Sequence, residues 1–122
     1  MNNYSTEIKQ FIIKDFKLHF GKGPEFVKVN ISDHIVVIDI KGSLTTLENS
    51  MLRNFPEDAK KTIRYIRKKL FDAEIECYLS EMRSVTNIED LKIENYMFDI
   101  DFVYDREIIV IICNKPLCRV DE

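Results

Sequence analysis

Two aspartates on one segment could bind a divalent cation. Asp99 and Asp101 are separated by a single residue, so on an extended strand both carboxylates lie on the same face. Carboxylate oxygens of this kind are ligands for Mg²⁺. The residues that alternate with them form an aromatic face, namely Tyr96, Phe98, Ile100 and Phe102. The same pattern is typical of a strand with one buried and one solvated face, so we expect Asp99 and Asp101 to be solvated. A metal site there is the weaker alternative, and no cofactor is expected.

Six basic residues gather in the first half of a predicted long helix: Lys60, Lys61, Arg64, Arg67, Lys68 and Lys69. Lys60, Arg64 and Lys68 are four residues apart and share one ridge, which could attract an anion or an acidic partner. No aromatic residue alternates with the bases as base stacking would require, so we expect no nucleic-acid partner. An ordinary solvated face is the favoured interpretation.

A second candidate for anion binding is the turn Gly21-Lys22-Gly23-Pro24. Its backbone amides and the lysine could hold a small anion, although the spacing of a phosphate-binding loop is absent. A structural turn is favoured, in which Gly23 needs a positive φ or a close backbone approach. The candidate ligand-binding residues are therefore Lys22, Gly23, Pro24, Lys60, Arg64 and Arg67.

Nucleophilic or zinc chemistry has no recognisable pattern in this chain. His19 and His34 have no cysteine or acid in a known catalytic spacing, and the three cysteines lack zinc-ligand spacing. Cys77 falls on an apolar helical stripe and Cys113 in an apolar strand, so both are expected in the core. We expect a protein that is not an enzyme.

Hydrophobic periodicity predicts one α+β domain over residues 1–122. The expected elements are a helix over 5–20 ended by Gly21, a hairpin over 25–41, helices over 46–55 and 56–83, a hairpin over 92–113 and a loose tail over 114–122. Thr45 and Glu48 form a capping box at the start of the second helix. The order helix–hairpin–helices–hairpin predicts a two-layer sandwich in which helices cover a four-stranded, mainly antiparallel sheet.

The helix over 56–83 is roughly 40 Å long at ~1.5 Å per residue, which exceeds the width of a domain this size. It must bend, break or pack on something outside its own sheet. It also carries two apolar stripes, one of them Ala59-Ile63-Ile66-Leu70-Ala73-Cys77. Because one domain cannot cover both, we expect a homodimer with this helix in or near the interface.

Composition limits the partners and the location. The chain has 122 residues, a formal charge of −3 and 45% hydrophobic residues. This balance gives no general attraction to nucleic acid or to an anionic membrane. The longest apolar runs, such as Ile108–Cys113, are too short to span a bilayer, and no signal peptide is recognised. The sequence therefore predicts a cytoplasmic protein that does not insert directly into a membrane.

The order of several motifs resembles a known bacterial family. These motifs are Gly21-Lys22-Gly23-Pro24, a Val/Ile-rich hairpin, Gly42-Ser43-Leu44-Thr45 with Glu48, and then Arg64 and Arg67. The family is the C component of a Na⁺-translocating, membrane-potential-generating (Mps) system, and the similarity runs from about Ser5 to Cys113. The resemblance implies a small soluble protein without established catalytic residues. The chain departs from the family pattern at Asn54-Phe55-Pro56, where members often have an acidic, glycine-containing stretch.

Three functions compete on these observations. The leading one is a cytoplasmic accessory or regulatory binding protein associated with a membrane cation or bicarbonate transport system. The second is a stand-alone sensor that binds a small anion at the glycine turn or the basic ridge. The third, and the weakest, is a metal-dependent enzyme that uses Asp99 and Asp101.

Overall fold

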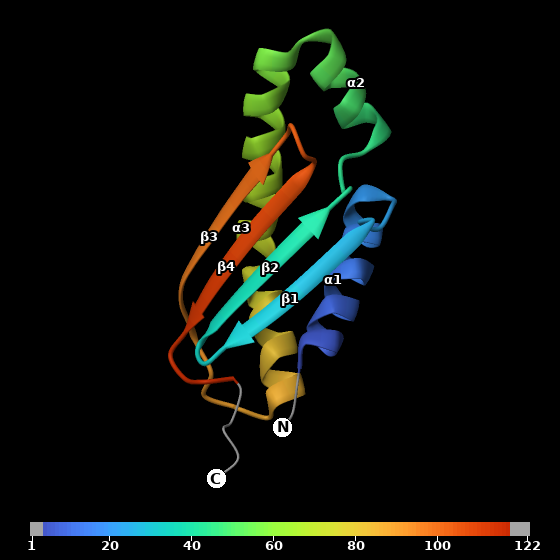
Figure 1. Cartoon of the computed structure of the whole chain (residues 1–122). Helices are drawn as coiled ribbons and strands as arrows, with labels where there is room; N and C mark the ends of the chain where they lie inside the picture. Colours follow the sequence, from blue (N-terminus) through green and yellow to red (C-terminus); the bar gives the residue numbers. More distant parts are fainter. Residues whose placement is uncertain (1–3, 118–122) are drawn as a thin grey trace.

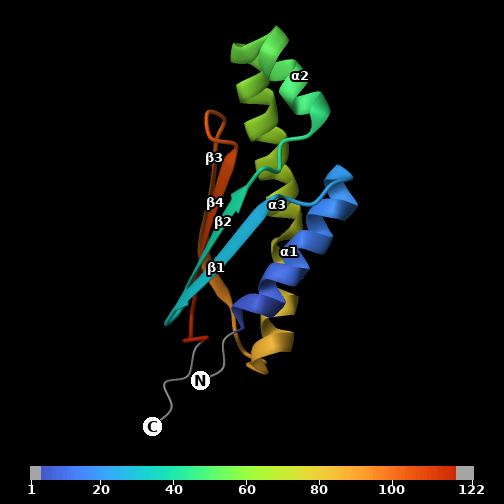
Figure 2. The same cartoon turned by 45° about the vertical axis from the view of Figure 1, so that its right-hand side comes forward.

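The computed structural model describes residues 4–117 and shows helices on one face of a four-stranded sheet (Figures 1 and 2). The elements are α1 (Ser5–Phe20), β1 (Phe26–Ser32), β2 (Ile35–Lys41), α2 (Thr46–Asn54), α3 (Pro56–Thr86), β3 (Ile93–Asp101) and β4 (Arg106–Cys113). The strand order is β1-β2-β4-β3, and each neighbouring pair is antiparallel. This confirms the predicted α+β class.

The sheet has one face toward the helices because apolar side chains alternate along its strands. In β2 and β4, Val36, Ile38, Ile40, Ile109 and Ile111 are almost completely buried and form the centre of the core. β4 lies between β2 and β3, in agreement with the prediction that an apolar strand is central rather than at an edge.

Helix α1 packs along the sheet through Ile8, Ile12 and Phe16, which recur at helical spacing and are buried. It ends at Gly21, whose φ of 76° places it in the left-handed region. The Gly21 amide donates to the Lys17 carbonyl at 3.0 Å, so it closes the last turn. The predicted glycine cap is confirmed.

Helix α3 is unbroken over 31 residues and extends past the end of the sheet (Figure 1). Beyond the sheet it packs against α2, which explains how its length is accommodated without a break. A second apolar cluster lies there, built from Leu44, Ala59, Ile63 and Ile100. The helix continues to Thr86, three residues past the predicted end, and stops at Asn87 with φ 57°.

The apolar stripe predicted along α3 is wrong beyond Ile63. Ile66 is 49% exposed and Cys77 is also exposed. The buried face instead runs from Ala59 and Ile63 through Arg67 to Phe71. Residues four apart lie on the same face of a helix, so this row faces the core. Arg67 occupies the core position that was predicted for Ile66, and the Ile66 side chain therefore points to solvent.

The start of the predicted loose tail is also corrected. Leu117 is completely buried, and its amide donates to the Asp33 carbonyl at 2.9 Å. An apolar side chain in the core and a backbone hydrogen bond fix this segment against the β1–β2 turn. The remainder of the tail, residues 118–122, lies outside the described residues.

Candidate functional site

Hydrogen bonds from backbone amides hold the segment between β2 and α2 in place. Gly42 has φ 70°, and its amide donates to the Asp105 carbonyl at 3.0 Å. The Ser43 and Leu44 amides both donate to Asp105 Oδ1 at 3.2 Å. These bonds tie the segment to the β3–β4 turn and turn the Ser43 side chain inward, where it is buried.

The predicted capping box at the start of α2 is present. The Glu48 amide donates to Thr45 Oγ1 at 3.1 Å, and the Thr45 amide donates to Glu48 Oε1 at 2.9 Å. The box fixes the Glu48 carboxylate at the helix N-terminus. From this position, Glu48 also reaches a side chain of α3.

That side chain is Arg67, which is 1% exposed. Its Nε and Nη2 donate to the two carboxylate oxygens of Glu48 at 2.9 and 2.6 Å, a bidentate pairing. Nη1 donates to Ser43 Oγ and Nη2 to the Ser43 carbonyl, both at 2.9 Å. Nη1 also donates to Glu107 of β4, and the guanidinium carbon lies 4.1 Å from the centre of the Phe20 ring. Arg67 thus joins α1, α2, α3 and the sheet.

The single guanidinium of Arg67 cannot neutralise two carboxylates completely, and the pKa values of Glu48 and Glu107 shift in opposite directions. Burial would raise the pKa of Glu48, but hydrogen bonds from Arg67 and Thr45 bring it below its usual value. Burial raises the pKa of Glu107 by more than Arg67 lowers it. The network therefore favours an ionised Glu48 and a Glu107 that binds a proton more readily than usual.

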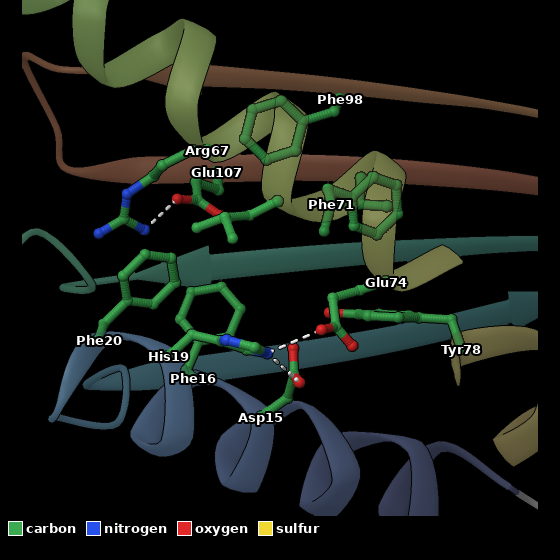
Figure 3. Close-up of a pocket in the computed structure, with 12 residues that line it drawn as sticks. Asp15, Phe16, His19, Phe20, Arg67, Phe71, Glu74, Tyr78, Phe98 and Glu107 are labelled. Carbon is green, nitrogen blue, oxygen red and sulfur yellow. Dashed lines mark hydrogen bonds and ion pairs between the residues drawn. The ribbon is translucent and has the colours of Figure 1, made fainter. Parts of the chain in front are cut away.

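A small pocket of about 30 Å³, partly open to solvent, lies beside this network between α1, α3 and the sheet (Figure 3). Its walls are mainly apolar and aromatic. The lining residues are Asp15, Phe16, His19, Phe20, Arg67, Leu70, Phe71, Glu74, Tyr78, Phe98, Glu107 and Ile109. Its polar groups form two clusters, Arg67 with Glu107, and Asp15 with His19 and Glu74 (Figure 3).

The second cluster joins α1 to α3. His19 Nε2 lies 3.2 Å from Asp15 Oδ1 and 2.8 Å from Glu74 Oε1. Burial, followed by the nearby Glu74 carboxylate, raises the pKa of Asp15, although His19 acts in the opposite direction. Two acids therefore converge on one imidazole nitrogen at the edge of the pocket.

The predicted anion-binding turn contacts the Ser43 segment. Lys22 Nζ donates to the Leu44 carbonyl at 3.3 Å, and Gly23 and Pro24 are partly buried in the loop between α1 and β1. The expected positive φ of Gly23 is wrong, because the glycines with positive φ are Gly21 and Gly42. A Cβ on Gly23 would lie 3.2 Å from the flexible Lys17 side chain rather than against backbone.

The basic residues predicted on α3 divide between solvent and core. On the predicted ridge, Lys60 is half-buried and Arg64 is exposed, and Arg64 Nε donates to Asp99 at 3.1 Å. The placement of Arg67 on a solvated face is wrong, since Glu48 and Glu107 provide the partners that allow its burial. Anion binding at Lys22, Gly23, Pro24, Lys60 and Arg64 stays a prediction.

Asp99 and Asp101 lie on the face of β3 opposite the core, where both are exposed as expected. Asp99 accepts from Arg64, whereas Asp101 Oδ1 accepts from the Val103 and Tyr104 amides at 2.9 and 3.4 Å. Each carboxylate therefore has a structural role of its own, in an ion pair or in the β3–β4 turn.

Sequence reasoning missed Asp15, Glu48, Glu74 and Glu107 as members of polar clusters. One signal was available, because Asp15 and His19 are four residues apart on a single helix and must share a face. The expected core position of Cys113 is confirmed, and that of Cys77 is wrong because its side chain is exposed. Cys118 lies outside the described residues.

Comparison with known proteins gives the family of the chain. None of the helices within residues 4–117 combines the length and the apolar composition needed to cross a membrane. Comparisons with curated proteins and with solved structures found no match. A family model described as "Na+-translocating membrane potential-generating system (MpsC)" matches residues 2–115. The match spans nearly all of the 122 residues, so the chain belongs to the MpsC family.

Proposed function

We propose that this protein is a cytoplasmic accessory or regulatory subunit of a Na⁺-translocating, membrane-potential-generating system, and that it acts by binding rather than by catalysis. The family match supports the association with such a system. The observation that carries the binding role is the sheet face opposite the helices, which is apolar at its centre.

No helix of the described residues covers this face (Figure 2). Its centre consists of alternate residues from the two inner strands and one from β3, namely Ile35, Val37, Met97, Ile108, Val110 and Ile112. All six are at least partly exposed, and Met97 is 53% exposed. An antiparallel sheet that faces water usually carries polar residues there, so an apolar centre favours a protein partner.

The pattern of charge around the centre favours a second copy of the chain. Lys28 on β1, Asp39 on β2, Ile108 on β4 and Asp99 on β3 lie in one row across the sheet. This row has the basic Lys28 at the β1 edge and the acidic Asp99, which also pairs with Arg64, at the β3 edge. A two-fold axis parallel to the strands places β1 over the partner's β3, and β2 over the partner's β4. Lys28 then faces Asp99, while the apolar centres pack together as in a β-sandwich.

This arrangement moves the expected dimer interface from α3 to the sheet. Light scattering at micromolar concentration should give twice the mass of one chain. Val110→Lys, which puts a charge at the centre of the face, should give a single-chain mass. Val103→Lys is the matched control because Val103 is 81% exposed in the β3–β4 turn, and it should remain dimeric. A wild-type mass of one chain that persists on concentration contradicts the dimer.

The charge pairing has a separate test. Lys28→Glu should weaken the dimer, and addition of Asp99→Lys should restore it by reversing both partners. If the double variant dimerises as weakly as Lys28→Glu alone, the two-fold arrangement is contradicted. That result would not contradict a dimer that uses the same sheet face in another orientation.

The role in Na⁺ translocation is tested in the native host. A strain that lacks this chain should lose the Na⁺-dependent part of its membrane potential. The wild-type gene should restore it, whereas Val110→Lys, a variant of the proposed interface, should not. An unchanged membrane potential in the deletion strain contradicts the proposed function.

A further inference from the structure

The Asp15–His19–Glu74 cluster has the composition and the geometry of a cation site. One atom from each side chain can serve as a ligand, and these atoms all lie within 4.8 Å of one another. Asp15 and His19 come from adjacent turns of α1, and Glu74 comes from α3, where it points at the imidazole (Figure 3). In a tetrahedral site with bonds of 2.0–2.2 Å, ligand atoms are separated by ~3.4 Å, which small side-chain movements would produce here.

The charges in the cluster are not balanced by its own residues. A neutral imidazole leaves two negative charges, and a protonated one still leaves a net charge of −1. A neutral imidazole also has only one N–H, so Nε2 can donate well to just one of the two carboxylates. A dication would replace that proton and neutralise both acids.

Three protein ligands leave the fourth position of a tetrahedral ion open to water. We propose that Asp15, His19 and Glu74 bind one transition-metal dication of the Zn²⁺ class, with the fourth position open to water. The imidazole nitrogen favours such an ion over Mg²⁺, which prefers an all-oxygen site. Because the ligands come from both helices, the ion would hold the C-terminal part of α1 against the middle of α3, at the edge of the aromatic pocket.

Calorimetry on chelator-treated protein tests the proposal with ZnCl₂ as the titrant. We expect one Zn²⁺ per chain with a micromolar or tighter Kd, and a higher melting temperature when Zn²⁺ is present. His19→Asn and Glu74→Gln should each weaken binding at least about tenfold, because even the loss of a group that only orients a metal ligand costs about 10–100-fold. His34→Asn is the matched control, because His34 contacts Asp33 in the exposed β1–β2 turn, and it should bind Zn²⁺ normally.

Co²⁺ reports on the geometry of the site. The wild type should show the intense visible bands of a four-coordinate ion, and His19→Asn should lose them. Zn²⁺ binding that is equal in wild type and His19→Asn would overturn the site, because the metal would then sit elsewhere. The same holds if no binding is detected at a Zn²⁺ concentration well above micromolar, or if Mg²⁺ competes equally. Circular dichroism of each variant confirms that a loss of binding is not a loss of fold, and none of these results depends on membrane potential or on dimer formation.

Discussion

Replacement of Arg67 by alanine tests the interpretation of the buried network most directly. The substitution removes the partner of Glu107, which is 2% exposed, and of Glu48, whose side chain is 14% exposed. It also leaves Ser43 without its guanidinium donor. Breaking a buried ion pair by removing one partner costs about 3–5 kcal/mol, because a charge remains buried without compensation. A domain of this size is stable by about 5–15 kcal/mol, so the variant should lose a large share of its stability.

Arg64→Ala is the matched control, since both arginines lie on α3 one turn apart. Arg64 is about half exposed and pairs with a largely exposed Asp99, so its loss should cost about 0–1 kcal/mol. Urea denaturation followed by circular dichroism measures both variants, because the chain has no tryptophan. Equal unfolding free energies for the two variants would refute the assignment of Arg67 as the centre of the buried polar network.

The pH dependence provides a second check on the same variant. The pKa of Glu107 is raised in the folded protein, and the loss of Arg67 should raise it further. A group with a raised folded pKa contributes stability below its unfolded pKa and loses that contribution as pH rises through the folded value. The cost of Arg67→Ala should therefore shrink as the pH is lowered toward about 4, as Glu107 becomes neutral. In the double variant Arg67→Met/Glu107→Met, much of the lost stability should return.

Three further predictions concern the backbone, the pH response and the thiols. Gly42→Ala should cost about 1–3 kcal/mol by urea denaturation, since Gly42 has φ 70° and a Cβ would lie 2.5 Å from a glutamate side chain. Gly23→Ala should lower the stability less. Equal losses for the two variants would contradict a special conformational requirement at Gly42. An arginine on the neighbouring strand lowers the pKa of Asp39, so this carboxylate adds stability above its unfolded pKa that is lost as pH falls. Wild type should then lose more stability between about pH 5 and pH 3 than Asp39→Asn, and parallel curves would contradict the pairing. A thiol reagent should modify Cys77 in the folded protein and Cys113 only after unfolding, because burial raises the pKa of Cys113 to about 11. Rapid labelling of both would contradict the buried position.

The sequence alone determined the features that depend on neighbours along the chain. Helical spacing in α1, alternation in the strands, the Gly21 cap and the Thr45–Glu48 box are all local, since each involves residues within a few positions of one another. The solvated side of β3 also followed from alternation, because successive side chains of a strand point to opposite faces.

Only the tertiary structure determined the polar clusters and the open sheet face. Arg67 looks like any other basic residue of a solvated helix until Glu107, 40 positions later, is brought beside it. The pair Asp15 and His19 is visible in the sequence, but Glu74 joins it only when α1 packs on α3. The sequence shows that β4 is apolar on both sides, but not that the helices cover one side alone. The physical reason is that burial of a charge depends on partners distant in sequence, and local periodicity contains no information about which distant groups packing brings together.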